Sequence, residues 1–219
     1  MSNSELHAGR HMVSCYKMWT IYNMSIQLTI PDAEILLYEG SSSPLMGTDF
    51  FDTLLNEIPW REETITLFGK THLQPRMLEF LGDQGIEYTY SRKRYRAIPW
   101  TDSLLHLRGI AEQVAQAPFN SVLANYYRNE RDSMGMHSDD EPELGMQPTI
   151  VSMSFGATRM FVLRHKTRRE ISPVRIPLHS ESILVMKGAT QQHWLHGIEK
   201  KTRALGPRIN LTFRCIKML

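Results

Sequence analysis

The apolar and polar positions of the first half of the chain predict two strands followed by two helices. Short apolar runs at 26–30 and 34–38 are separated by a Pro-Asp pair, as in two strands joined by a turn. Thr48 and Asp49 can begin a helix. The apolar stripe of that helix is Phe50, Phe51, Leu54, Leu55 and Ile58. A second helix is predicted from Asp102 to about Gln116, because Leu104, Leu107, Ala111 and Val114 recur at helical spacing.

From Asn120 onward the pattern changes to short strands separated by segments rich in Gly, Pro, Asp and Glu. The candidate strands are 121–127, 149–155, 160–164, 174–177, 182–187 and 208–216. Several short strands at nearly regular spacing predict a β-sandwich or barrel, with the two helices against one face. Residues 1–24 have no clean period, so we expect a weakly ordered extension there. A single domain over 25–219 follows, in which 25–119 precedes a β core at 120–219.

The composition is that of a globular protein. Of 219 residues, 42% are apolar and 22% are charged, which excludes wholesale disorder. Two cysteines are too few for a disulfide framework and favour a reducing compartment, so we expect a cytoplasmic protein, associated with the nucleoid if bacterial. No apolar run approaches the roughly 20 residues of a membrane helix, and the first 30 residues lack the order of a secretory signal. We therefore expect no membrane partner.

The net charge of +2 hides an uneven distribution. Residues 1–158 carry 12 Lys and Arg against 20 Asp and Glu, whereas residues 159–219 carry 13 against 3. A basic C-terminal third indicates a polyanionic partner such as a nucleic acid. A solvated basic face without a partner explains the charge equally well at this point.

His137-Ser138-Asp139 is the sharpest local feature. In an extended segment the side chains at i and i+2 share a face, so His137 and Asp139 would point the same way. An imidazole, a carboxylate and a distant second histidine form the facial triad of non-haem Fe(II) oxygenases, which leaves positions open for cosubstrate and O₂. A zinc hydrolase also keeps an open position, but usually takes more His or Cys ligands. The second histidine could be His193 or His196, and spacing alone does not choose between them.

The segment 207–214 alternates strictly along a predicted strand. Arg208, Asn210, Thr212 and Arg214 share one face, and Ile209, Leu211 and Phe213 the other. A half-buried edge strand would show this pattern. Two arginines on one face could also hold the two carboxylates of a small diacid through bidentate hydrogen bonds. Asn125 and Tyr127 form a similar polar pair just before the His-x-Asp motif, and the whole set suggests 2-oxoglutarate as cosubstrate.

Together these motifs resemble the AlkB family of Fe(II)/2-oxoglutarate-dependent dioxygenases, which repair alkylated bases. The resemblance rests on order and spacing over residues 65–216. It is carried by Asn125-Tyr126-Tyr127, His137-Ser138-Asp139-Asp140-Glu141, the segments 152–156 and 164–166, His193-Trp194-Leu195-His196, and 207–214. It implies a mostly β fold: a double-stranded β-helix (jelly-roll) core with buttressing helices and an N-terminal nucleotide-recognition lid.

The resemblance also implies roles for individual residues. The iron ligands would be His137, Asp139 and His196, which leaves His193 outside the site. The residues that bind 2-oxoglutarate would be Asn125, Tyr127, Arg208, Asn210, Thr212 and Arg214. Asp140 or Glu141 would contact the damaged base, and the sequence does not say which.

Upstream segments resemble the family's substrate-binding parts. Leu67-Phe68-Gly69-Lys70 is similar to the finger that some members insert into the duplex. In it Phe68 would stack, Gly69 would permit close approach and Lys70 would meet phosphate. Tyr88-Thr89-Tyr90-Ser91 matches the lid segment in which an aromatic ring stacks on the flipped base, and Arg92, Lys93, Arg94 and Arg96 follow it. Phe68 could instead be a core residue, and two tyrosines are ordinary in a strand.

The expected function is oxidative demethylation of N-alkylated bases such as 1-methyladenine and 3-methylcytosine. Fe(II), O₂ and 2-oxoglutarate would be used, and aldehyde, succinate and CO₂ released. We expect a monomeric enzyme that acts on these bases in DNA, so that alkylated DNA is the expected partner and RNA comes second. Two alternatives are the same chemistry on RNA or protein, and a non-catalytic nucleic-acid-binding module with a relic site. The intact ligands and both arginines argue against the relic.

Overall fold

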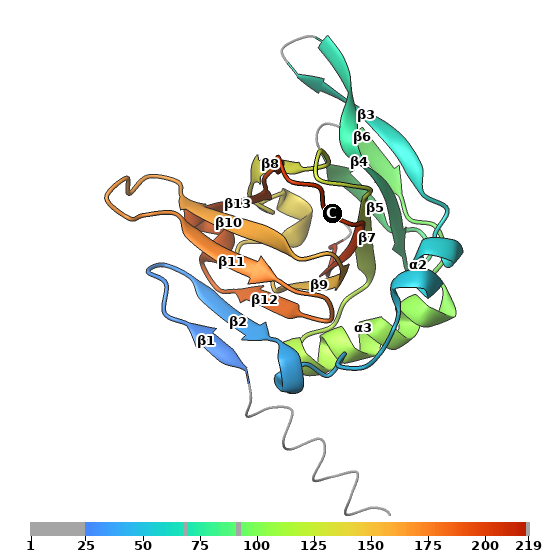
Figure 1. Ribbon diagram of the computed structural model, residues 1–219, viewed down its shortest axis with the longest axis horizontal. Helices are drawn as coiled ribbons and strands as arrows, with labels where there is room; N and C mark the ends of the chain where they lie inside the picture. The colour runs from blue at the N-terminus through green and yellow to red at the C-terminus, as the bar shows by residue number, and fades with distance from the viewer. Residues whose placement is uncertain (1–24, 68–69, 91–92, 218–219) are drawn as a thin grey trace, which may run out of the picture.

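The computed structural model describes residues 25–67, 70–90 and 93–217, in which two facing β-sheets enclose the site and helices cover the larger sheet (Figure 1). The larger sheet has eight strands in the order β1-β2-β12-β9-β14-β7-β4-β3, all paired antiparallel. Their bounds are Ile26–Leu28 (β1), Glu34–Tyr38 (β2), Ile183–Lys187 (β12), Ile150–Gly156 (β9), Arg208–Arg214 (β14), Ser121–Tyr127 (β7), Lys70–Gly82 (β4) and Arg61–Leu67 (β3).

The smaller sheet has four strands in the order β11-β10-β13-β8. Their bounds are Val174–Leu178, Arg159–His165, Trp194–Ile198 and Met134–His137. Strands β5 (Glu87–Tyr90) and β6 (Lys93–Arg96) form a separate hairpin. Two opposed antiparallel sheets with the helices on one side confirm the expected jelly-roll fold. Four strands of the larger sheet, β1 to β4, come from residues before 120, so the sheet is wider than the segment 120–219 that we expected to form the core.

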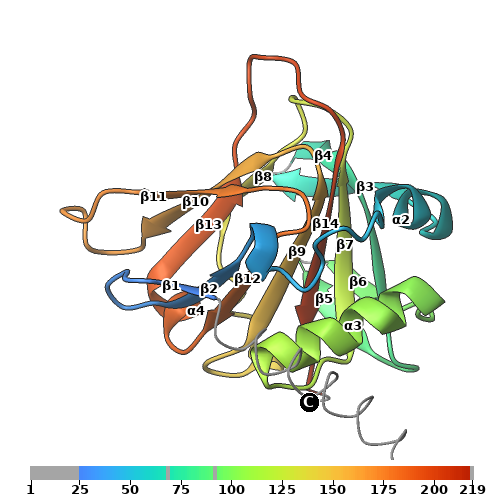
Figure 2. The same cartoon turned by 60° about the horizontal axis from the view of Figure 1, so that its bottom comes forward.

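Helices α2 (Phe51–Glu57) and α3 (Asp102–Ala115) lie along the outer face of the larger sheet (Figure 2), as the sequence predicts. Thr101 caps α3, because its side chain accepts a hydrogen bond from the backbone N–H of Leu104. Helix α2 begins three residues later than Thr48, whose hydroxyl donates to the carbonyl of Leu45 and therefore does not cap it. The remaining helical segments are the short α4 (Thr190–His193) and two 3₁₀ turns, Gly40–Ser42 and Pro142–Leu144.

Strand alternation separates a packed core from the site. Ile209, Leu211 and Phe213 of β14 pack with the buried face of α3, whereas the residues between them face the space between the two sheets. A second apolar cluster fills the rest of that space and includes Leu163, Trp194 and Tyr127. None of the helices in the described ranges has the length and apolar composition needed to cross a membrane.

Candidate metal and cosubstrate site

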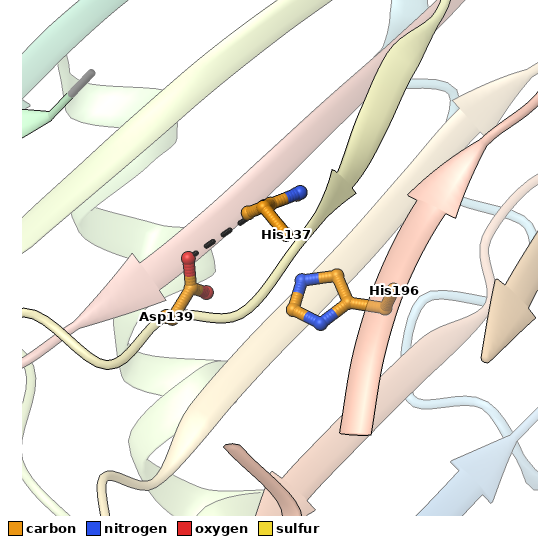
Figure 3. A group of neighbouring side chains, drawn as sticks. All are labelled: His137, Asp139 and His196. Carbon is orange, nitrogen blue, oxygen red and sulfur yellow. Dashed lines mark ion pairs between the residues drawn. The ribbon is translucent and has the colours of Figure 1, made fainter. Parts of the chain in front are cut away.

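Strands of the smaller sheet bring together one cluster of metal-ligating side chains. His137 is the last residue of β8, Asp139 follows two residues later, and His196 lies on β13, where it pairs in register with His137. One ligand atom from each lies within 4.8 Å of the others. Figure 3 shows the three side chains converging from β8, the loop that follows it and β13, although His137 and His196 are 59 positions apart in the sequence.

The electrostatics of this cluster keep its imidazoles neutral. Burial lowers the pKa of His137, and burial together with the charge of His137 lowers that of His196 to about 3. The Nδ1 atom of His137 lies 2.9 Å from the carbonyl of Gly135, which can only accept, so Nδ1 carries the proton and Nε2 is left for a metal. Within the described part of the chain the buried Nδ1 of His196 has no hydrogen-bond partner. Two neutral imidazoles and a carboxylate suit Fe(II).

Asp139 is fully buried and fixed from two sides. The Arg214 Nη2 atom lies 2.8 Å from both carboxylate oxygens, and the Asp139 backbone N–H donates to Gln191 at 3.0 Å. Burial raises the pKa of Asp139, but the charge and hydrogen bonds of Arg214 outweigh burial and hold it at about 2. Asp139 is therefore an ionised ligand. We expected Arg214 to bind cosubstrate, but its Nε and Nη2 atoms donate hydrogen bonds to the Asp139 carboxylate. Its Nη1 atom has no partner among the described residues.

His193 lies outside the cluster, at the end of α4. Its ring stacks on His165 with centroids 5.8 Å apart, and its carbonyl accepts from the Lys166 N–H. The two histidines belong to different elements, because α4 ends at His193 and β13 begins at Trp194. The structure therefore brings His196 to the other two ligands and leaves His193 elsewhere.

A cavity lined by His137 and His196 opens between the two sheets. Its lining includes all six residues predicted to bind cosubstrate. They are Asn125, Tyr127, Arg208, Asn210, Thr212 and Arg214. Strands β7 and β14 pair Arg208 with Tyr127 and Asn210 with Asn125, which explains why residues 85 positions apart share one wall.

Arg208 is the cavity's unsatisfied cation. It is 1% exposed, its Nη2 donates to the Ser154 hydroxyl at 2.9 Å, and its Nε and Nη1 atoms have no partner in the described ranges. Burial lowers the pKa of Arg208 to about 10. A buried guanidinium with two free donors is costly unless an anion pairs with it. A carboxylate that accepts both hydrogen bonds satisfies this requirement, so the residues present fit 2-oxoglutarate.

The two acidic candidates for base contact have different surroundings. Asp140 is exposed and pairs with Lys166 Nζ at 2.9 Å, and it also accepts from the Ser138 hydroxyl. Glu141 is half-buried near Tyr88 and Asp139, and its Oε2 is buried without a hydrogen-bond partner among the described residues. Burial and the nearby charge of Asp139 raise the pKa of Glu141. Glu141 is thus the acidic side chain of this pair that has a buried oxygen without a hydrogen-bond partner among the described residues.

The predicted finger and lid lie on two hairpins. Lys70 is exposed at the start of β4, while Phe68 and Gly69 lie outside the described residues. Tyr88 on β5 is buried and its ring lies 5.7 Å from the Arg214 guanidinium carbon, and Thr89 is exposed. Tyr90 ends β5, and Ser91 is outside the described residues. Tyr88 therefore contacts the residue that holds the metal ligand Asp139.

Sequence reasoning missed several residues that complete the site. Ser152 and Ser154 of β9 accept hydrogen bonds from Asn210 and Arg208, and Gln191 holds the backbone of Asp139. Arg76 of β4 is buried and donates to the Asn125 side chain at 2.7 Å. The two serines at i and i+2 in the apolar strand IVSMSFG were the available signal. The sequence around Arg76 holds no such signal, because Pro75 interrupts the pattern that would predict a strand there.

Comparisons with known proteins agree with this geometry. Residues 34–214 match the family model described as the 2OG-Fe(II) oxygenase superfamily. The human alpha-ketoglutarate-dependent dioxygenase alkB homolog 3 is 38% identical over 204 residues, which cover 90% of this chain and 70% of that protein. The human DNA oxidative demethylase ALKBH2 is 42% identical over 189 residues, covering 80% and 72%. The bovine alkB homolog 3 is 43% identical, and the match spans 76% of this chain and 60% of the bovine protein.

A solved structure supports the fold alone. The structure of OsALKBH1 superimposes with a TM-score of 0.63 at 18% identity, covering 86% of this chain and 99% of that one.

Proposed function

Because this chain belongs to the AlkB family of Fe(II)- and 2-oxoglutarate-dependent dioxygenases, we propose that it removes alkyl groups from damaged bases in DNA or RNA. The substrates we propose are 1-methyladenine and 3-methylcytosine. The observation that carries the proposal is the juxtaposition of the His137-Asp139-His196 cluster with the buried, unsatisfied Arg208 at one cavity. A non-catalytic binding module has no need for this costly arrangement.

The chain's own residues bind and orient the reactants. His137, Asp139 and His196 would hold Fe(II), and Arg208 would pair with the remote carboxylate of 2-oxoglutarate. When bound, the iron and 2-oxoglutarate would supply the O₂-dependent oxidation of the alkyl group. The oxidised alkyl group would leave as an aldehyde, and 2-oxoglutarate would become succinate and CO₂. Arg214 fixes the Asp139 carboxylate, so the ligand set is organised before the metal binds.

Of the two acidic residues after Asp139, Glu141 is the one that would recognise the damaged base. The Glu141 Oε2 atom, which has no partner among the described residues, can accept a hydrogen bond from an exocyclic amino group of adenine or cytosine. Asp140 is exposed and forms an ion pair with Lys166. We propose Glu141 as the principal base contact of the two.

We also propose that the enzyme works as a monomer in the cytoplasm. All residues of the site come from one chain, and the sequence holds two cysteines in total.

The test is a side-by-side turnover assay on oligonucleotides that carry 1-methyladenine or 3-methylcytosine, as single-stranded DNA, duplex DNA and RNA. Succinate and formaldehyde should appear in equal amounts with methylated substrate, and the unmethylated oligonucleotides are the control. Glu141→Gln should slow turnover more than Asp140→Asn does. If protein loaded with iron and 2-oxoglutarate repairs none of these substrates, nucleic-acid dealkylation is wrong.

A further inference from the structure

One buried cation next to the cavity is not explained by the residues that line it. Arg159, the first residue of β10, is 1% exposed. Its guanidinium donates to three backbone carbonyls: Asn129 at 3.2 Å, Asp132 at 2.7 Å and Glu199 at 2.8 Å. Arg159 does not line the cavity, so it would not touch 2-oxoglutarate itself.

The three carbonyls belong to two loops that border the cosubstrate residues. Residues 128–133 connect β7 to β8, and residues 199–207 connect β13 to β14. Figure 2 shows these loops rising together at the top of the molecule, and the Lys201 N–H donates to the Glu130 carbonyl between them. Tyr127 immediately precedes the first loop and Arg208 immediately follows the second. Arg159 therefore joins the two loops whose ends carry a cross-strand pair of cavity residues.

Arg159 also contacts the Tyr127 member of this pair directly. Its guanidinium carbon lies 5.4 Å from the centroid of the Tyr127 ring, and that of Arg208 lies 5.2 Å from the same centroid. The ring of Tyr127 is thus held by two guanidinium groups. The charge of Arg159 is met by three carbonyls, whereas no carboxylate of the described residues pairs with Arg208.

We infer that Arg159 is a positioning residue for 2-oxoglutarate, which fixes Tyr127 and Arg208 by joining the 128–133 and 199–207 loops against the Tyr127 ring. The inference rests on the proposed function, because it assumes that this cavity binds that diacid. Loss of Arg159 frees both loop ends, so the geometry of the Tyr127–Arg208 pair is no longer set before the cosubstrate arrives.

The experiment measures binding and not turnover. The affinity of the full chain loaded with Mn²⁺ for 2-oxoglutarate is determined by calorimetry without O₂, and the affinity for Mn²⁺ is determined separately. Arg159→Met should weaken 2-oxoglutarate binding by about tenfold, as the loss of preorganising hydrogen bonds suggests. The affinity for Mn²⁺ should stay within about twofold, because Arg159 contacts none of His137, Asp139 and His196.

The matched control is Arg175→Met. Arg175 pairs with the Glu199 carboxylate from the exposed side at 2.8 Å, so this variant also removes a cation from the same loop residue without affecting the Tyr127 ring. It should bind 2-oxoglutarate as the parent does. Unchanged 2-oxoglutarate affinity in Arg159→Met overturns the inference, and so does an equal loss of affinity for 2-oxoglutarate and Mn²⁺, which indicates a general structural role.

A double-mutant cycle tests the route through Tyr127. If Arg159 acts through the ring, Arg159→Met combined with Tyr127→Leu, which removes the ring, should bind no more weakly than the weaker single variant. Additive losses overturn the inference. Should Arg159→Met fail to fold, Arg159→Lys replaces it, since one ammonium cannot serve both loops in the same geometry; parental affinity in that variant overturns the inference too. Failure of the parent chain to bind 2-oxoglutarate would instead refute the proposed function.

Discussion

At the scale of single residues, the structure separates two histidines that the sequence presents as a pair. His196 lies with His137 and Asp139, whereas His193 stacks on His165. We predict that His137→Ala, Asp139→Ala and His196→Ala each abolish turnover, because a three-ligand site does not tolerate the loss of a ligand. His193→Ala should keep most of the activity in the same assay. An inactive His193→Ala beside an active His196→Ala would reverse the assignment.

The Asp139–Arg214 pair predicts a stability effect in the absence of metal. Both side chains are buried, so Asp139→Asn leaves an uncompensated guanidinium and should lower the free energy of unfolding by about 3–5 kcal/mol. Urea denaturation of metal-free protein measures it. Glu199→Gln breaks an exposed ion pair and should cost at most about 1 kcal/mol. An Asp139→Asn variant as stable as the parent would contradict this view.

The sign of the pH dependence follows from the lowered pKa of Asp139. The folded state favours the ionised carboxylate, so its contribution is fully present above the ordinary pKa of 3.8 and is lost as pH falls towards about 2. The stability difference between the parent and Asp139→Asn should therefore shrink over that acidic range.

Arg208 gives a prediction on cosubstrate affinity. An ammonium group is a point charge and cannot reproduce the planar two-bond contact with a carboxylate, so Arg208→Lys should raise the apparent KM for 2-oxoglutarate. Steady-state kinetics at varied 2-oxoglutarate checks it, with Arg164→Lys on the exposed face of β10 as control. The same KM in Arg208→Lys and the parent would remove Arg208 from the site.

At the scale of elements, the sequence predicts the alternation along β14 but not the position of this strand within the sheet. A polar face can mean an edge strand in water, yet β14 lies between β9 and β7 and all seven of its residues are buried. The polar face of β14 lines a cavity. Whether a polar face lines a cavity or meets solvent depends on which strands of the other sheet lie opposite it. Alternation within one strand carries no information about that opposing sheet.

Some elements could not be predicted at all. Strand β8 is Met-Gly-Met-His, four residues with a glycine, and β4 contains Pro75, so neither has a clear strand pattern. The loops around Arg159 likewise bring together residues from 129 to 199, a contact that local pattern cannot reveal. The three metal ligands could be predicted only from the order of the family's motifs along the chain, because His137 and His196 come together only when β8 and β13 pair.

The β3–β4 hairpin projects from the body of the molecule (Figure 1), and Leu67 and Lys70, the first and last residues of the predicted finger, belong to its two strands. We predict that Phe68→Ala lowers repair of duplex substrate more than of single-stranded substrate, where no base partner needs replacing. Leu73→Ala, which shortens an exposed apolar side chain on the same hairpin, is the control and should affect both substrates alike. Equal losses in Phe68→Ala on both substrates would indicate a general stacking role or a core residue.

At the scale of the whole molecule, the basic C-terminal third predicts salt-sensitive binding. DNA affinity should fall linearly with salt on logarithmic axes, because phosphate contacts release counterions. Arg164→Gln, which removes an exposed charge from β10, should reduce the slope by about 1. Arg108→Gln on α3, across the larger sheet, should leave the slope unchanged. Identical slopes in the parent and Arg164→Gln would mean that Arg164 does not contact phosphate.

The width of the larger sheet has a consequence for aggregation. Within the described ranges its two edges are β1, three residues long, and β3, which begins with Arg61 and Glu62. Short and charged edges discourage pairing with another molecule. Next to β1, β2 covers β12, whose five residues are apolar except for Lys187. A chain shortened to begin after Tyr38 would expose this apolar strand as a new edge, and intermolecular β-pairing would then compete with folding.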